Sequence, residues 1–188
     1  MAYFPAFIQL KNKKVLIIGG GKIAQEKLQK LLDFTTDITL IAKEFSKECM
    51  ELVTKHSLTY RQKSYETGDI EGFAIVIAAI DDIELQKSIY KETRSYNCLY
   101  NAVDVPELCD FIFPSYIKEG DLIIAVSTSG ASPAFAKQLR IYLQSLLPKN
   151  IDAFLEEMKA YRASLPKGKE RMKMLEEKAK KFIQGFRK

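Results

Sequence analysis

The sequence predicts an α/β fold: a Rossmann-like, doubly wound parallel sheet, followed by a small α+β segment and a C-terminal helical domain. Two observations support this fold class. Short apolar runs alternate with helical patterns over residues 14–104, as in parallel sheets whose strands are joined by helices. A three-glycine turn directly follows the first of these runs. After about residue 110 the alternation stops, so we expect three regions: 1–112, 113–147 and 148–188.

Five strands are expected in the first region: Val15–Ile18, Asp37–Ala42, Leu58–Lys63, Ala74–Ala79 and Cys98–Val103. The fourth run is wholly apolar, which is typical of a strand buried on both faces of a parallel sheet. Ser46 stands where a helix ending near His56 would need its N-cap, and Asp81-Asp82 stands before a helix expected to reach about Tyr96.

The second region, residues 113–147, does not continue the alternation of strands and helices. Phe111–Tyr116 and Leu122–Ser127 are separated only by the turn Lys118–Asp121, which favours an antiparallel pair over another crossover. Ser132 followed by Pro133 predicts the start of a helix that runs to about Leu147. Two more helices are expected beyond it. Their apolar side chains recur at helical spacing and need a surface to cover them, which a small helical domain or a dimer contact would provide.

The net charge of +5 comes from the tail, because residues 1–150 carry 18 basic and 18 acidic side chains and residues 151–188 carry 11 and 6. A basic tail is suited to nucleic acid, to a polyanionic small molecule, or to solvent alone. No aromatic and basic interleaving accompanies it, so we expect no nucleic-acid partner.

The sequence has neither a signal-peptide pattern nor an apolar run of about 20 residues, so we expect a cytoplasmic protein without a membrane partner. Cys49, Cys98 and Cys109 are odd in number and form no C-x-x-C pair, which favours reduced thiols. His56 is the only histidine, and no metal site is expected.

Gly19, Gly21 and Ala24 occupy the three small positions of G-x-G-x-x-G/A, between an expected strand and an expected helix. This arrangement predicts a dinucleotide site in which the pyrophosphate lies on the helix N-terminus. The alternative is an ordinary structural turn, because similar glycine triplets also join strands to helices without a ligand.

The end of the second strand leaves the choice of dinucleotide open. Rossmann domains usually carry an acidic residue there, which accepts a hydrogen bond from the adenosine ribose. This chain has Ala42 and Lys43 at that place, and Glu44 is displaced. Lys43 would suit a 2′-phosphate or solvent, whereas Glu44 or backbone amides would suit an NAD ribose. We favour NAD, because one lysine is weak support for a phosphate site.

Two further groups of polar residues are candidates. Asn101 and Asp104 end the fifth strand, at the sheet edge where ligands bind, and Asp104 there either acts on a substrate or caps a turn. Ser127, Thr128 and Ser129 precede a helix N-terminus, where they either bind an anion or cap the helix.

Six segments, in order, resemble the signatures of precorrin-2 dehydrogenases, the N-terminal module of siroheme synthases: Tyr3–Leu10, Gly19–Ala24, Ala78–Asp82, Asn101–Pro106, Phe111–Ser115 and Val126–Pro133. The likeness spans about residues 1–150. It implies oxidation of precorrin-2 to sirohydrochlorin with NAD and, in some members, insertion of ferrous iron into that product. A non-catalytic module that binds a tetrapyrrole or a dinucleotide for regulation is the alternative.

The resemblance also assigns residues by position. It implies that Asp104 is catalytic and that residues 113–147 form the contact of a homodimer. Residues 1–112 would be the NAD-binding domain. The remaining site residues that we expect are Lys22, Ile23, Lys43, Glu44, Ala79 and Asn101 at the cofactor, and Ser127, Thr128 and Ser129 at the substrate. At 188 residues the chain is shorter than trifunctional siroheme synthases, so precorrin-2 is expected to come from another protein.

Overall fold

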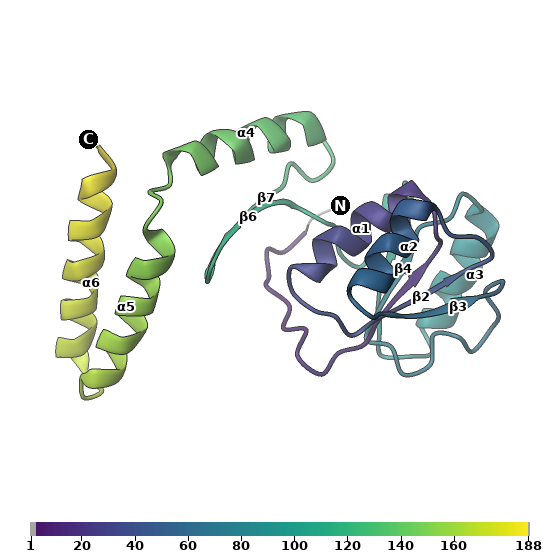
Figure 1. Cartoon of the computed structure of the whole chain (residues 1–188), viewed down its shortest axis with the longest axis horizontal. Coiled ribbons are helices and arrows are strands. Elements are labelled where there is room, and N and C mark those ends of the chain that lie inside the picture. Colours follow the sequence, from purple (N-terminus) through teal and green to yellow (C-terminus); the bar gives the residue numbers. More distant parts are fainter. Residues whose placement is uncertain (1–2, 188) are drawn as a thin grey trace. The chain divides into compact units, whose positions relative to one another are not determined.

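A computed structural model describes residues 3–187 of the chain. These residues form two compact units, 3–112 and 113–187, whose elements are labelled in Figure 1. The first unit holds the parallel sheet. The second holds a β-hairpin and three helices.

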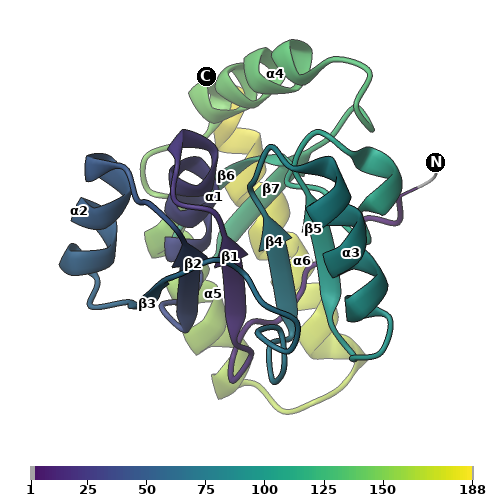
Figure 2. The same cartoon turned by 90° about the vertical axis from the view of Figure 1, so that its right-hand side faces the viewer.

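The first unit contains a five-stranded parallel sheet of order β3-β2-β1-β4-β5, seen face-on in Figure 2. Its central strand β1 pairs with β2 on one side and with β4 on the other. Strands before β4 are added on one side of β1 and later strands on the other, so the order of the strands reverses at β1. Ligands bind at such switch points in open α/β sheets. The strands are β1 (Val15–Ile18), β2 (Ile38–Ala42), β3 (Thr59–Gln62), β4 (Ile75–Ala78) and β5 (Leu99–Ala102).

Helices cover both faces of this sheet. In Figure 1, α1 (Lys22–Leu32) and α2 (Lys47–Lys55) lie on one side and α3 (Ile83–Thr93) on the other. Leu16 and Ile18 of β1 belong to one buried cluster with Ile89 of α3. Because side chains alternate along a strand, Val15 and Ile17 point to the opposite, equally buried face. The predicted doubly wound sheet is therefore confirmed.

The predicted helix caps are confirmed as well. The Ser46 hydroxyl accepts a hydrogen bond from Cys49 N at 3.2 Å, and the Asp82 carboxylate accepts one from Leu85 N at 2.9 Å. Helix α3 ends at Thr93, three residues before the predicted end. The next residues form tighter bonds typical of a helix end, such as Ser95 N to Glu92 O at 3.0 Å. A short 3₁₀ helix, η1 (Pro106–Leu108), follows β5.

In the second unit, β6 (Ser115–Glu119) and β7 (Leu122–Val126) form an antiparallel hairpin. The predicted first strand, Phe111–Tyr116, was wrong in its position. Pro114 has no N–H for a strand ladder, so pairing begins after it and includes Lys118 and Glu119, which we had assigned to the turn. A two-residue loop suffices because Gly120 adopts a positive φ of 56°.

The helices of the second unit are α4 (Pro133–Leu146), α5 (Ile151–Ser164) and α6 (Lys169–Gln184), and the short η2 (Gly185–Arg187) follows. Helix α4 packs on the hairpin. The rings of Phe154 in α5 and Phe182 in α6 stack with their centroids 3.7 Å apart, which joins the last two helices. None of the helices described in residues 3–187 is both long and apolar enough to cross a membrane.

Candidate functional site

The turn after β1 lies at the carboxyl edge of the sheet. Gly19 has a φ of +125°, which favours glycine, and a Cβ placed there would overlap the backbone oxygen of Ala79. A Cβ at Gly20 would overlap the backbone oxygen of Glu44, and the Gly20 carbonyl accepts from Ser46 N at 2.8 Å. These two glycines are therefore required by the protein's own packing.

Gly21 differs from its neighbours. Its φ of −85° and ψ of −168° suit any residue, and a Cβ there would meet no atom of the described residues within 4 Å. It stands at the N-cap of α1, whose first-turn amides receive no side-chain cap. The space over Gly21 is thus open and faces unpaired amide donors, which fits the pyrophosphate of a dinucleotide.

The other residues of this turn lie where the motif requires. Ala24, in the first turn of α1, is fully buried, so its small side chain allows close packing of the helix on the sheet. Lys22 is exposed and Ile23 is half-buried in the first turn of α1. Both are next to the open space over Gly21.

Lys43 and Glu44 form a bend directly after β2, and both side chains are exposed. The backbone of this bend is held from β3, because Gln62 Nε2 donates to the Lys43 carbonyl at 3.3 Å. The bend is on the same sheet edge as the glycine turn, where a Rossmann domain holds the adenosine ribose.

Asp104 follows β5 at the same edge, with its side chain exposed and a φ of +61°. Val105, not Asp104, is the N-cap residue of η1, and no side chain caps that helix. The Asp104 carboxylate accepts no hydrogen bond from residues 3–187. Asp104 does lie in a turn, as the structural alternative expects, but its carboxylate makes no capping bond within residues 3–187 and is left available to a ligand.

Two groups surround the Asp104 loop. The Cys109 thiol donates to Ala102 O at 3.1 Å, and burial raises the pKa of this thiol, so it stays a protonated donor. Lys27 belongs to α1; burial lowers its pKa, and the negative charge of Asp104 opposes that shift. An ammonium group on the helix that follows the glycine turn therefore lies within electrostatic reach of Asp104.

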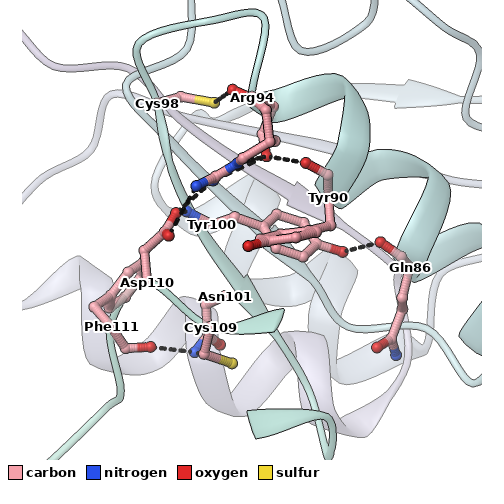
Figure 3. Close-up of polar contacts among 10 residues, drawn as sticks. Gln86, Tyr90, Arg94, Cys98, Tyr100, Asn101, Cys109, Asp110 and Phe111 are labelled. Atoms are coloured by element: carbon pink, nitrogen blue, oxygen red, sulfur yellow. Dashed lines mark hydrogen bonds and ion pairs between the residues drawn. The ribbon is translucent and has the colours of Figure 1, made fainter. Parts of the chain in front are cut away.

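Asn101 is turned into the protein rather than toward the edge. It is only 4% exposed, and its Nδ2 donates to Phe111 O at 2.8 Å (Figure 3). Its expected contact with the cofactor stays a prediction. The side chain instead ties β5 to the segment that leaves the first unit.

Sequence reasoning missed an ion pair that anchors the same segment. Arg94 Nη2 and Nη1 donate to the two oxygens of Asp110 at 2.6 and 3.0 Å, and Asp110 Oδ2 also accepts from Tyr100 N at 2.8 Å (Figure 3). The guanidinium lies 4.6 Å from the centre of the Tyr90 ring. No local pattern marks a pair that is sixteen residues apart.

Gln86 was missed as well. This residue of α3 is 2% exposed, and its Nε2 donates to Ile80 O at 2.6 Å and to Val103 O at 3.3 Å. Ile80 follows Ala79, which is half-buried and donates to Ile18 O at 2.7 Å. The only signal in the sequence was a polar side chain on the buried face of an amphipathic helix.

The Ser127–Ser129 loop lies in the second unit, before α4. Ser127 Oγ accepts from Ser129 N and Thr128 Oγ1 accepts from Ser132 N, both at 3.0 Å. Ser132 Oγ in turn accepts from Phe135 N at 3.2 Å. The loop therefore does cap the helix, and its expected contact with a substrate stays a prediction.

A metal centre would need several ligating side chains close together in the part of the chain that the structure describes. Within it, no three or more His, Cys, Asp or Glu side chains are grouped so that they could hold a metal ion.

Comparison with known families agrees with this geometry. The family described as "Putative NAD(P)-binding" matches residues 6–115, and the one described as "Sirohaem biosynthesis protein central" matches residues 119–144. The first match includes every residue that we place at the carboxyl edge of the sheet.

Similar curated proteins include the siroheme synthases of Methylococcus capsulatus, 40% identical, and of Ruthia magnifica subsp. Calyptogena magnifica, 36% identical. Each alignment covers 148 residues, which is 79% of this chain and 31% of the relative. The chain thus spans about a third of the length of these relatives. The resemblance seen in the sequence is confirmed over that part.

Among solved structures, "SirC, precorrin-2 dehydrogenase" has a similar fold, with a TM-score of 0.75 and 24% sequence identity. The match covers 98% of this chain and 99% of that one. Because the NAD(P)-binding family matches more than half of the sequence, at the residues that form the open glycine turn, the chain belongs to that family.

Proposed function

We propose that this protein oxidises precorrin-2 to sirohydrochlorin with NAD as the hydride acceptor. The observation that carries the proposal is the carboxyl edge of the sheet, where the open space over Gly21 and the exposed Asp104 carboxylate lie on one edge. The similarity to siroheme synthases supports the choice of substrate.

The cofactor would be held by the glycine turn. The first-turn amides of α1 would donate to the pyrophosphate, and the missing Cβ of Gly21 would let the phosphates approach the backbone. Ala79, on the neighbouring strand end, lies against Gly19 of the same turn. Lys43 and Glu44 would lie next to the adenosine ribose, and the carboxylate of Glu44 would disfavour a 2′-phosphate there, which supports NAD over NADP.

When bound, the nicotinamide supplies the hydride acceptor. Oxidation removes a hydride and a proton from precorrin-2; the nicotinamide would take up the hydride, and Asp104 would accept the proton. Asp104 suits this role because its carboxylate is exposed and accepts no hydrogen bond from the described part of the chain. Lys27 places an ammonium group within electrostatic reach of that carboxylate.

The Ser127–Ser129 loop would bind the carboxylates of the substrate. The oxygens of Ser127 and Thr128 accept capping bonds, which leaves each O–H free to donate. Carboxylates are acceptors, so these donors suit precorrin-2.

The proposal is tested by mixing the purified protein with NAD and precorrin-2 without oxygen. Formation of NADH in step with the sirohydrochlorin spectrum is expected. If the protein binds both compounds but no NADH forms, it is a non-catalytic binding module instead. Adding ferrous iron after the first reaction then tests the second activity that the resemblance implies, because siroheme has a different spectrum.

The proposal includes a cytoplasmic homodimer whose contact is made by residues 113–147. Within the described chain β6 and β7 pair only with each other, and α4 exposes Phe135, Tyr142 and Leu146. A two-stranded sheet is marginal alone, and exposed apolar side chains favour burial. All three cysteines are free thiols, which supports a reducing compartment such as the cytoplasm. Light scattering of wild type and of Tyr142→Glu, with Ile183→Glu of α6 as control, tests the dimer: only Tyr142→Glu should yield monomers.

A further inference from the structure

We propose that Gln86 is a positioning residue that holds the loop carrying Ala79 and the loop carrying Asp104 in one fixed arrangement. The inference rests on the proposed function, because it assigns those loops to the cofactor and to proton transfer. Gln86 itself is buried and touches neither ligand.

A single side-chain amide joins the two loops. Gln86 Nε2 donates to Ile80 O at 2.6 Å, directly after Ala79, and to Val103 O at 3.3 Å, directly before Asp104. The hydrogen bond from Val103 N to Ala78 O is the last one between β4 and β5. The carbonyls of Ile80 and Val103 lie beyond it and have no partner in the sheet within residues 3–187. Gln86 supplies a donor to both of them.

A neutral amide of this length suits both carbonyls. Both partners are carbonyls, so a carboxylate would place an oxygen against two oxygens, and a hydrocarbon would leave both unpaired. The residue is also fixed at its backbone, because the Tyr100 hydroxyl of β5 donates to Gln86 O at 2.9 Å (Figure 3). A residue of the sheet therefore fixes the backbone from which the Gln86 amide extends.

The rest of the Gln86 side chain argues against a packing role. Its Oε1 is buried and has no hydrogen-bond partner among the described residues. A half-satisfied buried amide costs stability that an apolar side chain of the same shape would not. Asp104, with its φ of +61°, stands in a turn directly after Val103, so the position of the Val103 carbonyl affects where this turn begins. The hydrogen bond from Gln86 to Val103 O restrains that position.

The test compares Gln86→Met with Thr93→Val. Methionine keeps the length and flexibility of glutamine but donates nothing. Thr93 is a buried polar residue at the other end of α3 whose hydroxyl donates within its own helix, to Tyr90 O at 2.6 Å. We expect Gln86→Met to lower kcat about tenfold or more and to change KM for NAD less than threefold. Thr93→Val should keep the wild-type kcat, even if its melting temperature falls as much as that of Gln86→Met.

Gln86→Glu adds a second readout, the pH dependence of kcat, which would not change if Gln86 only stabilised the fold. Burial raises the pKa of the new carboxyl, and only its protonated form donates to a carbonyl. The kcat of this variant should therefore rise as the pH falls, relative to wild type at each pH. A ratio to wild type that does not change with pH contradicts the inference.

Hydrogen exchange separates this inference from the proposed function. If wild type oxidises precorrin-2 and Gln86→Met keeps the wild-type kcat, the positioning role is overturned and the proposed function stands. If wild type does not oxidise precorrin-2, the proposed function fails. The restraint of the two loops by Gln86 is then tested by amide hydrogen exchange. Faster exchange near Ile80 and Val103 in Gln86→Met, but not in Thr93→Val, supports the restraint. Unchanged exchange in Gln86→Met overturns it.

Discussion

Gly19 and Gly21 lack a side chain for different physical reasons. Gly21 has an ordinary backbone conformation and open space above it, so Gly21→Ala should fold as stably as wild type to within about 1 kcal/mol. The added methyl would occupy the space that we assign to the pyrophosphate. The dissociation constant for NAD, measured by titration calorimetry, is therefore expected to rise at least tenfold. An unchanged constant would mean that the dinucleotide does not approach this turn.

The matched variant is Gly19→Ala. Its Cβ would overlap Ala79 O and would sit on a backbone with φ of +125°. Strain and overlap together should lower the free energy of unfolding by about 2 kcal/mol or more. Two glycines of one motif thus separate into one that is needed for folding and one that is needed for the ligand.

Asp104 gives the second test at this scale. Asn keeps the shape of Asp and tolerates the left-handed region, so Asp104→Asn should retain the fold and the affinity for NAD. It has lost the proton acceptor, and kcat for precorrin-2 should fall by about 10²- to 10⁴-fold. Stopped-flow detection of NADH measures the loss. Wild-type turnover in this variant would remove Asp104 from the mechanism.

At the scale of elements, the Arg94–Asp110 pair fixes how the chain leaves the sheet. Asp110→Asn removes one charge but can still accept from Tyr100 N, so the change reports on the ion pair. The two side chains are 43% and 23% exposed, so solvent screens the pair. We expect a loss of about 1 kcal/mol in urea unfolding. The loss should shrink at high salt, and a loss independent of salt would contradict a charge effect.

Elements with strong local signals were predictable from the sequence. Ser46 and Asp82 cap helices through bonds to residues three positions ahead, and such short-range chemistry is visible in a sequence. The first strand of the hairpin was misplaced because Phe111 and its neighbours have a strand-like pattern. Their backbone instead serves the first unit, where Phe111 O accepts from Asn101.

The glycine turn and the strand ends were likewise predictable, because a motif and its flanking elements define them. The residues that connect strand ends were not. Gln86 reaches Val103, seventeen positions away, and Arg94 reaches Asp110, sixteen positions away. Such contacts depend on which strands become neighbours, so they become visible only when the order β4-β5 is known.

At the scale of the whole molecule, charge is distributed unevenly. The excess of basic residues lies in 151–188, which forms α5 and α6. Some of these lysines are paired within the second unit, as Lys178 is with Glu157 and Lys180 with Glu176. Lys167, Lys169 and Lys173 are exposed and form no ion pair within residues 3–187. Their field is therefore available to a polyanion such as the proposed substrate.

Reversing these three charges tests that role. The triple variant Lys167→Glu, Lys169→Glu, Lys173→Glu should raise KM for precorrin-2 severalfold and weaken its dependence on salt, because long-range attraction is screened by ions. Its kcat should not change. The control reverses Lys11, Lys13 and Lys14, which are exposed before β1 at the amino edge of the sheet and change the net charge equally. Equal KM values in the two triple variants would show that only net charge matters, and a wild-type KM in both would leave the basic tail as a solvated surface.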